Sequence, residues 1–274
     1  MSEPETAADE FRVLADKITQ ETSFRCASYK DKCLRRRIAV RMRARGAESF
    51  SAYVLVLDSD RREYDRLLDA LTVNVTKFFR NPSTFDALAA SVVPQLWQTE
   101  GRISVWSAGS SSGEEAFSLA ALFYEHALAL GELDRLARVT VIGSDIDRAS
   151  LAAAEKARYA AASFADTPTH LLDALFPAVG DSRTVIEPVR SLVRFERRDI
   201  LREPPPAASY DLIACRNVII YLDREAQEEL LCSFHRALRP GGFLVMGRVE
   251  TLLGKPRQLF GTVDVRERIF RKAR

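Results

Sequence analysis

Two adjacent glutamates, Glu114 and Glu115, follow the glycine-rich stretch 109–113, whose composition is typical of a ligand-binding loop. Glycine lets a backbone turn sharply and approach a ligand closely. A phosphate-binding loop of the GxxxxGK[ST] type would carry a lysine here. Carboxylates would instead repel a triphosphate at neutral pH, but they would attract a cation or accept hydrogen bonds from hydroxyl groups. The loop therefore predicts a ligand other than a nucleoside triphosphate.

A third acid, Asp145, ends the next predicted strand, where an acid can bind ribose hydroxyls. Dinucleotide enzymes share that acid, but their GxGxxG fingerprint is absent from this chain. A positively charged nucleoside without phosphate fits both observations, and S-adenosylmethionine, with its ribose, sulfonium and ammonium, is such a ligand. Two alternatives stay open: a nucleotide-dependent enzyme, and a glutamate pair that only stabilises the first turn of a helix.

These acids require a sheet and helices to position them, and alternating patterns from about residue 102 predict both. Strands are expected at 102–108, 138–147, 191–200, 210–222, 243–247 and 265–272, and helices at 114–130, 148–157 and 224–238. The residues Arg239-Pro240-Gly241-Gly242 are expected to form a turn. Strands that alternate with helices predict an α/β fold with a doubly wound sheet. The stretch at about 160–195 breaks this alternation and predicts a small inserted subdomain.

Helical patterns dominate the first part of the chain, which predicts an N-terminal all-helical domain over residues 1–80 and an α/β domain over 81–274. Residues 25–45 contain nine basic residues and one acid, a net charge of +8, so the remainder carries −6 of the total +2. Leu34, Ile38 and Met42 recur every fourth residue there and predict one buried helix face. The basic residues would then be free for an acidic partner, although a merely solvated face or nucleic-acid binding stays open.

Composition excludes several other classes of protein. No apolar run approaches the roughly 20 residues that cross a bilayer. The polar N-terminus is unlike a secretory signal. Four cysteines without a CxxC pair, together with three histidines, argue against a zinc site and for reduced thiols. We therefore expect a cytoplasmic protein without a metal.

Several blocks together resemble the CheR-type chemoreceptor glutamate methyltransferases of bacterial chemotaxis. They are TVNVTKFFRNPSTF (72–85), VWSAGSSSGEEAFSLA (105–120), GSDID (143–147), YDLIACRNVIIYLD (210–223) and LRPGGFLVMG (238–247). The helical N-terminal part with its basic helix matches as well, so the resemblance covers nearly the whole chain.

The resemblance implies a Rossmann-like methyltransferase that forms methyl esters on glutamate side chains of chemoreceptors. S-adenosylmethionine would donate the methyl group, S-adenosylhomocysteine would be the product, and no metal would take part. The expected partner is the cytoplasmic methylation region of the receptors, bound by a monomer without nucleic acid and without insertion into the membrane. The implied catalytic residues are Arg80, Arg216 and Tyr221; the implied cofactor-binding residues are Asn74, Thr76, Arg80, Glu115, Asp145, Asp199, Arg216 and Asn217; and the implied partner-binding residues are Arg35, Arg36 and Arg43.

Three departures from the family pattern bear on these expectations. Ala116 stands where proline is usual, a mild change, and Arg248 and Val249 stand where His-Ser is usual, which puts any role of those two positions in doubt. The stretch near 175–190 is short and lacks the glycine-rich segment of members that grip a receptor tail peptide. Two other functions stay open: a nucleic-acid methyltransferase, which the basic helix would permit, and a catalytically silent S-adenosylmethionine-binding scaffold, which the change at Arg248 and Val249 would permit.

Overall fold

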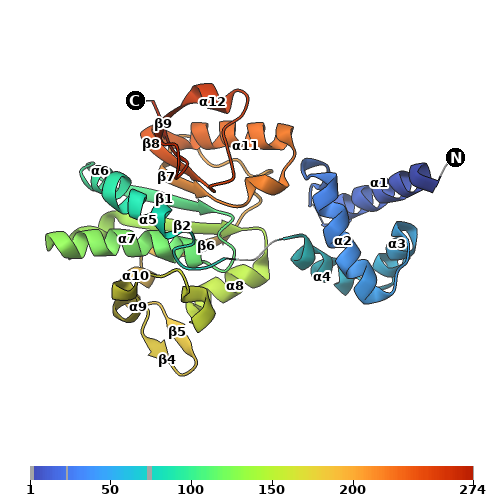
Figure 1. Ribbon diagram of the computed structural model, residues 1–274, viewed down its shortest axis with the longest axis horizontal. Coiled ribbons are helices and arrows are strands. Elements are labelled where there is room, and N and C mark those ends of the chain that lie inside the picture. The colour runs from blue at the N-terminus through green and yellow to red at the C-terminus, as the bar shows by residue number, and fades with distance from the viewer. Residues whose placement is uncertain (1–2, 23, 73–75, 274) are drawn as a thin grey trace. The chain divides into compact units, whose positions relative to one another are not determined.

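The structure, a computed structural model, describes residues 3–22, 24–72 and 76–273. The chain folds into two units (Figure 1). The first comprises Met1–Val73 and Tyr221–Gln227, and the second comprises Asn74–Ile220 and Glu228–Arg274. The predicted boundary after residue 80 therefore lies inside the second unit. No helix in the described ranges is long and apolar enough to span a bilayer.

The second unit is built on a seven-stranded sheet. Its strands are β1 (Ile103–Ala108), β2 (Val139–Asp145), β6 (Val193–Arg197), β7 (Tyr210–Cys215), β8 (Leu238–Met246), β9 (Phe260–Asp264) and β10 (Ile269–Lys272). Their order is β6-β2-β1-β7-β8-β10-β9. The first five in this order are parallel, and β10 is antiparallel to both of its neighbours. Because β1 lies between β2 and β7, the strand order reverses beside it, which is where such sheets bind ligands.

Helices cover both faces of this sheet. Successive side chains of a strand point to opposite faces, and β1 uses both. Val105 packs in the core that contains Phe117 of α7 (Glu114–Leu130), whereas the ring of Trp106 lies edge-on to Phe234 of α11 (Arg224–Ala237), 5.4 Å between centroids. Figure 1 draws α7 below the strands and α11 above them. The predicted doubly wound α/β sheet is confirmed.

Other elements frame the sheet. They are α5 (Pro82–Ala87), a π-helical turn (Leu88–Val92), α6 (Val93–Trp97), α8 (Arg148–Lys156) and α12 (Pro256–Leu259). The helices before β1 and the edge strand β9 were not among the predicted elements. Their segments are short, and neither an apolar period nor a turn signal separates them clearly from loops.

The predicted strand 265–272 begins only at Ile269, and two further differences from the predicted elements have backbone reasons. The predicted strand 210–222 ends at Cys215, because Asn217 adopts a left-handed conformation (φ 61°) that no strand continues. The predicted turn at residues 239–242 lies inside β8 instead. Tyr210 pairs with Leu238 and Leu212 with Phe243, so these four residues bulge out of the ladder, and Gly241 (φ 78°) supplies the required conformation.

The predicted insert folds as a separate three-stranded sheet with the order β3-β5-β4. Its elements are β3 (Arg158–Ala160), α9 (Thr169–Leu175), β4 (Ala178–Val179), β5 (Ser182–Thr184) and α10 (Glu187–Arg190). The chain rejoins the main sheet at β6, close to the predicted end of the insert.

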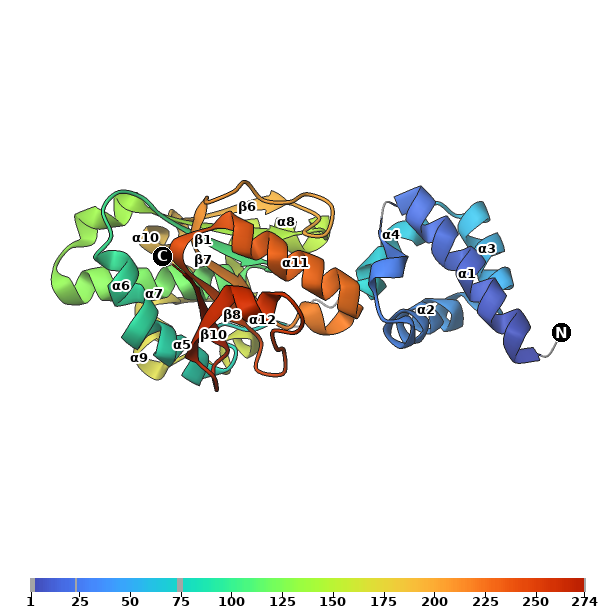
Figure 2. The same cartoon turned by 90° about the horizontal axis from the view of Figure 1, so that it is seen from above.

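Helices α1 to α4 belong to the first unit and are seen from a second side in Figure 2. They are α1 (Glu3–Thr22), α2 (Asp31–Arg45), α3 (Phe50–Ser59) and α4 (Arg62–Leu71). Leu34, Ile38 and Met42 of α2 are buried in its apolar core, as their four-residue spacing predicted.

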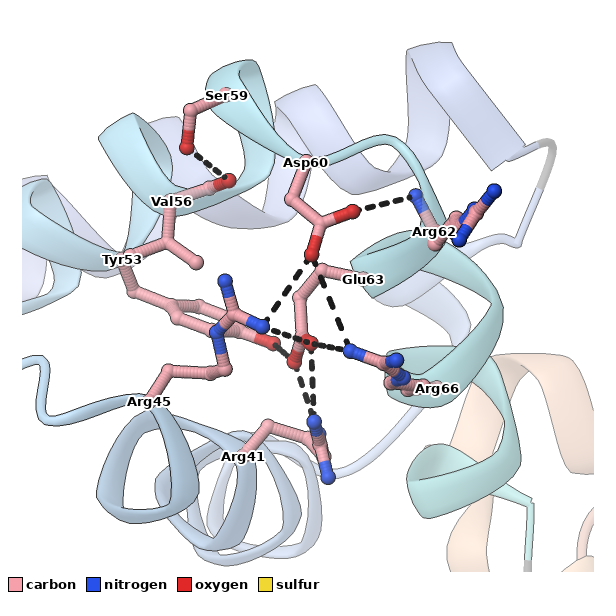
Figure 3. Close-up of polar contacts among 9 residues, drawn as sticks. All are labelled: Arg41, Arg45, Tyr53, Val56, Ser59, Asp60, Arg62, Glu63 and Arg66. Atoms are coloured by element: carbon pink, nitrogen blue, oxygen red, sulfur yellow. Dashed lines mark hydrogen bonds and ion pairs between the residues drawn. The ribbon is translucent and has the colours of Figure 1, made fainter.

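A buried carboxylate, Glu63 of α4, joins three helices of this unit (Figure 3). Arg41 of α2 grips it with two hydrogen bonds, Nε to Oε1 and Nη2 to Oε2, both 2.9 Å. The Tyr53 hydroxyl of α3 donates to Oε1 at 2.9 Å. Arg45 and Arg66 add ion pairs at 3.8 and 3.6 Å. Two basic residues of the +8 segment, Arg41 and Arg45, therefore neutralise a buried acid.

Burial alone would raise the pKa of Glu63, but the hydrogen bonds from Arg41 and Tyr53 outweigh it and hold the pKa below its ordinary value. A carboxyl whose pKa is lower in the folded than in the unfolded state stabilises the fold above its ordinary pKa. That stabilisation is lost as the pH falls through the folded-state value.

We predict that Glu63→Ala lowers the free energy of unfolding by about 3–5 kcal/mol, because it leaves a charge without its buried partner. The matched control Glu21→Ala breaks an exposed pair with Arg61 (2.9 Å) and should cost less than about 1 kcal/mol. Urea unfolding followed by circular dichroism measures both. Trp97 and Trp106 lie in the second unit, so their fluorescence transition should not move.

The difference between wild type and Glu63→Ala should also shrink in acid, as the wild-type carboxylate becomes protonated. An unfolding free energy of Glu63→Ala equal to that of Glu21→Ala at neutral pH would contradict this role of Glu63.

Candidate functional site

The glycine-rich loop follows β1 and adopts three left-handed conformations, at Gly109 (φ 78°), Ser111 (φ 51°) and Gly113 (φ 92°). The N–H groups of Gly109 and Ser110 both donate to the Ser144 carbonyl at 2.9 Å. A Cβ atom on Gly109 would lie 2.6 Å from Val218 Cγ2, and one on Gly113 would lie 2.7 Å from the Phe195 ring. Both glycines are therefore required by close packing as well as by backbone angle.

Asp145 lies at the carboxyl end of β2, where the sequence placed it. Its Oδ2 accepts the Ser111 N–H at 2.8 Å and its Oδ1 accepts the Asp147 N–H at 3.0 Å. Burial raises the pKa of Asp145, and these backbone bonds oppose the rise. The carboxylate thus ties the glycine-rich loop to β2, and its remaining lone pairs can accept hydrogen bonds from ligand hydroxyls.

Glu115 of α7 is held from two sides. Its Oε1 accepts a hydrogen bond from Ser107 Oγ at 2.8 Å, and its Oε2 pairs with Arg216 Nη1 at 3.3 Å. Glu114 points elsewhere: it is buried, and its Oε2 accepts from Ser112 Oγ at 2.7 Å. Burial raises the pKa of Glu114. Of the two glutamates, only Glu115 pairs with Arg216 among the described contacts.

Arg216 is the residue that joins three parts of the site. Besides Glu115, its Nη2 donates to the Arg80 carbonyl at 2.6 Å and to Asn81 Oδ1 at 3.1 Å. Its guanidinium lies 5.2 Å from the centroid of the Phe85 ring. Arg80, Glu115 and Arg216, predicted from three distant sequence blocks, are therefore brought together in the fold.

The segment around Arg80 has an unusual backbone, with Phe79 (φ 51°) and Asn81 (φ 64°) both left-handed. The Phe79 N–H donates to the buried Ser118 Oγ at 2.9 Å. Phe78 stacks on Phe164 of the insert, with ring centroids 4.4 Å apart. Non-glycine residues persist in such conformations only where their surroundings enforce them, typically at functional sites.

The same segment is anchored on its far side by Thr84, whose Oγ1 donates to Glu267 Oε2 at 2.7 Å. Glu267 also pairs with Arg248 at 3.0 Å. Arg248, which the sequence left without a role, thus helps to hold the start of α5.

Asn217 follows β7 and is the fourth left-handed non-glycine residue in these loops. Its N–H donates to Glu250 Oε2 at 3.1 Å. Sequence reasoning missed Glu250 because it considered only the neighbouring Arg248 and Val249, whose roles it put in doubt. The available signal was an acid three residues after the predicted strand 243–247.

The remaining predicted residues are spread more widely. Asp199 is largely buried and accepts the Leu201 N–H at 2.9 Å, and Thr76 is half-buried. Asn74 lies outside the described residues. Tyr221 belongs to the first unit, where the Arg37 guanidinium lies 4.8 Å from its ring centroid. The functional roles of these four residues stay predictions.

Three buried polar atoms around this site make no hydrogen bond within the described part of the chain: Ser110 Oγ, Ser111 Oγ and Arg216 Nε. Buried polar atoms usually have partners, so the loop has polar groups to offer a ligand. Together with the carboxylates of Asp145 and Glu115, they suit the hydroxyl and ammonium groups of S-adenosylmethionine. Over the same described residues, no cluster of three or more His, Cys, Asp or Glu could hold a metal ion.

Comparison with known proteins matches both units. Residues 74–269 match the family described as "CheR methyltransferase, SAM binding domain", and residues 9–72 match "CheR methyltransferase, all-alpha domain". Chemotaxis protein methyltransferase 2 of Pseudomonas aeruginosa is 32% identical over 251 residues, which cover 89% of this chain and 87% of that protein.

Two further relatives differ from each other in how much of their own length this chain covers. The chemotaxis protein methyltransferase of Listeria monocytogenes is 31% identical over 228 residues, 83% of this chain and 84% of that protein. An uncharacterized 104.1 kDa protein of Rhodobacter capsulatus is 33% identical over 249 residues, 90% of this chain. The chain spans only 26% of that longer relative.

We predict that Asp145→Ala weakens S-adenosylmethionine binding by about 1–3 kcal/mol, through loss of charge-assisted hydrogen bonds. The neighbouring Asp147→Ala is the control. Asp147 Oδ1 caps α8 by accepting the Ala149 N–H at 2.9 Å, so its loss should cost about 0.5–2 kcal/mol of stability without changing affinity. Calorimetric titration and thermal unfolding measure the two quantities. Wild-type affinity in a folded Asp145→Ala protein would remove Asp145 from the binding site.

Proposed function

The chain belongs to the CheR methyltransferase family, and from this premise we propose that it transfers the methyl group of S-adenosylmethionine to glutamate side chains of bacterial chemoreceptors. The product would be a glutamate methyl ester. The observation that carries the proposal is the convergence of Arg80, Glu115 and Arg216, beside the acid-lined glycine-rich loop. Relatives named chemotaxis protein methyltransferase support the substrate class.

A glutamate carboxylate suits this site because it is already ionised near neutral pH and needs no general base. S-adenosylmethionine, when bound, supplies a methyl group on a sulfonium centre. The protein has to align a carboxylate oxygen with that methyl group and exclude water, so positioning dominates the rate. No described residue is required to take up a proton.

Within this proposal, Asp145 and Glu115 hold the cofactor. Further contacts would come from Thr76, Asp199 and Asn217. Asn74, which was also predicted to contact the cofactor, lies outside the described residues. Arg80 orients the substrate carboxylate through one oxygen, because contacts to both oxygens would weaken the nucleophile. Arg216 is half of an internal ion pair with Glu115 and also braces the Arg80 carbonyl. Its contribution to methyl transfer therefore includes shaping the segment that carries Arg80. The role of Tyr221 toward the substrate stays a prediction.

The first unit would bind the receptor through exposed cations of α2. Arg37, Arg41 and Arg45 are engaged internally: Arg37 Nη1 donates to the Leu71 carbonyl at 2.9 Å, and the other two face Glu63. Arg35 lies 3.8 Å from the Phe11 ring centroid. The exposed cations Lys32, Arg36 and Arg43 lie along one side of the helix.

We propose that this exposed row binds the acidic, cytoplasmic methylation region of the receptors, with Arg35 at its edge. Complementary charge raises the rate of encounter and selects the partner. Three further expectations stay predictions: the enzyme is a monomer, it is cytoplasmic, and it lacks a tether to a receptor tail peptide.

Labelled methyl transfer to receptor-containing membranes tests the proposed reaction. Ester formation predicts incorporated label that mild base releases as methanol. Base-stable label in nucleic acid would favour the alternative methyltransferase, and S-adenosylmethionine binding without transfer would favour a silent scaffold. Either result would overturn the proposal.

We predict that Arg80→Ala lowers turnover by about tenfold to a thousandfold, as expected for loss of a charged orienting contact, while thermal stability changes little. The control Arg102→Ala removes an exposed arginine of the same unit and should leave turnover unchanged. Activity that only follows the folded fraction of Arg80→Ala would show that Arg80 serves stability alone.

We also predict that the double substitution Arg36→Glu and Arg43→Glu raises the KM for receptor and flattens its salt dependence. Screening shortens from ~10 Å at 0.1 M salt to ~3 Å at 1 M, so the wild-type KM should rise with salt. Arg102→Glu with Arg266→Glu makes the same change of −4 in the second unit and serves as the control. Unchanged receptor kinetics in the α2 variant would mean that its cations are only solvated.

A further inference from the structure

Glu250 is a buried carboxylate that gathers backbone N–H groups from two loops. Its Oε2 accepts the N–H of Gly247 at 2.5 Å and of Asn217 at 3.1 Å, and its Oε1 accepts the N–H of Ile220 at 3.3 Å. Ile219 also donates its backbone N–H. Burial raises the pKa of Glu250, and these four donors counteract the rise. The carboxylate therefore binds an entire turn of backbone.

The turn that it holds, residues 217–220, directly follows Arg216. Asn217 is left-handed there (φ 61°), a conformation that costs a non-glycine residue of order 1–3 kcal/mol and needs outside support. Converging N–H groups form a natural anion-binding nest, and the chain fills this nest with its own carboxylate.

Close packing leaves little freedom on either side of this contact. A Cβ atom on Gly247 would lie 2.7 Å from Glu250 Oε2 and 2.9 Å from the Asn217 nitrogen, so only glycine lets the carboxylate reach both loops. Val218 of the same turn packs against Gly109 of the glycine-rich loop. A shift of the turn would therefore disturb both Arg216 and the ligand loop.

The two residues before Glu250 do not share this task. Arg248 pairs with Glu267 at 3.0 Å, and Val249 is 75% exposed. Their side chains can change without removing a donor or acceptor from the turn. Val249 thus provides a neighbouring control position.

We propose that Glu250 is a positioning residue for methyl transfer: its carboxylate fixes the turn 217–220 and thereby the location of Arg216 and Asn217. The catalytic part of this inference rests on the proposed function, whereas the structural part does not. Glu250 touches neither substrate nor cofactor in this role and acts through the backbone.

Glu250→Gln tests the proposal, because the amide NH₂ would face N–H donors while the side-chain volume stays nearly constant. Hydrogen exchange followed by mass spectrometry should show faster exchange of the amides of Asn217, Ile220 and Gly247, by about tenfold or more for the loss of a charge-assisted bond. Methyl transfer should fall by a similar factor. Formate should partly restore activity to Glu250→Ala, since the nest would accept a small anion. Val249→Ser should match wild type throughout.

Wild-type exchange in folded Glu250→Gln would overturn the proposal, and so would accelerated exchange with undiminished methyl transfer. If Glu250→Gln does not fold, Glu250→Asp replaces it. This variant keeps the charge but has a side chain one methylene shorter. Unchanged exchange at the same amides in Glu250→Asp would also contradict the proposal. A wild-type protein that methylates no receptor would refute the proposed function, yet the exchange measurement would still decide whether Glu250 fixes the turn.

Discussion

One buried guanidinium organises the candidate site. Arg216 pairs with Glu115 at 3.3 Å and donates to the Arg80 carbonyl at 2.6 Å, so it joins the helix after β1, the turn after β7 and the segment before α5. A charge buried to this extent is tolerated only when it is paired and hydrogen-bonded. The fold therefore cannot bury Arg216 without also setting the distance between the acid-lined loop and Arg80. Ser107 completes the arrangement by holding the other oxygen of Glu115.

Four of the seven left-handed non-glycine residues in the described part of the chain lie in the loops of this site. Phe79, Asn81, Ser111 and Asn217 are left-handed non-glycine residues, and each lies in a loop that the site uses. Each of these loops has a polar support: Ser118 for the segment around Arg80, Asp145 for the glycine-rich loop and Glu250 for the turn after Arg216. The supports for the first two come from α7 and β2, elements with buried, regular backbone, which hold these irregular loops in place. In the first unit the buried polar group, Glu63, instead joins helices through the side chains of Arg41 and Tyr53.

The sequence predicted the features that depend on local pattern. The doubly wound sheet, the buried face of α2 and the position of Asp145 at a strand end all follow from periodicity and strand polarity. It could not predict the pairing of Glu115 with Arg216, because 101 residues separate them and either could have met another partner. Residues 239–242 were predicted to form a turn and instead form a bulge, because glycine and proline are common in both turns and bulges. The overall charge of residues 25–45 also concealed that Arg41 and Arg45 face the buried Glu63, a contact that only tertiary structure reveals.

We propose that Glu115 and Arg216 act as one unit in forming the cofactor site. A double-mutant cycle with Glu115→Gln, Arg216→Gln and the combined variant, read out as S-adenosylmethionine affinity by calorimetry, tests it most directly. Residues in contact show coupling energies of about 0.5–3 kcal/mol, and we expect at least ~1 kcal/mol for this pair because the pair is buried. Effects that add to within about 0.3 kcal/mol in folded variants would mean that the two residues act independently, and would contradict a shared role in the cofactor site.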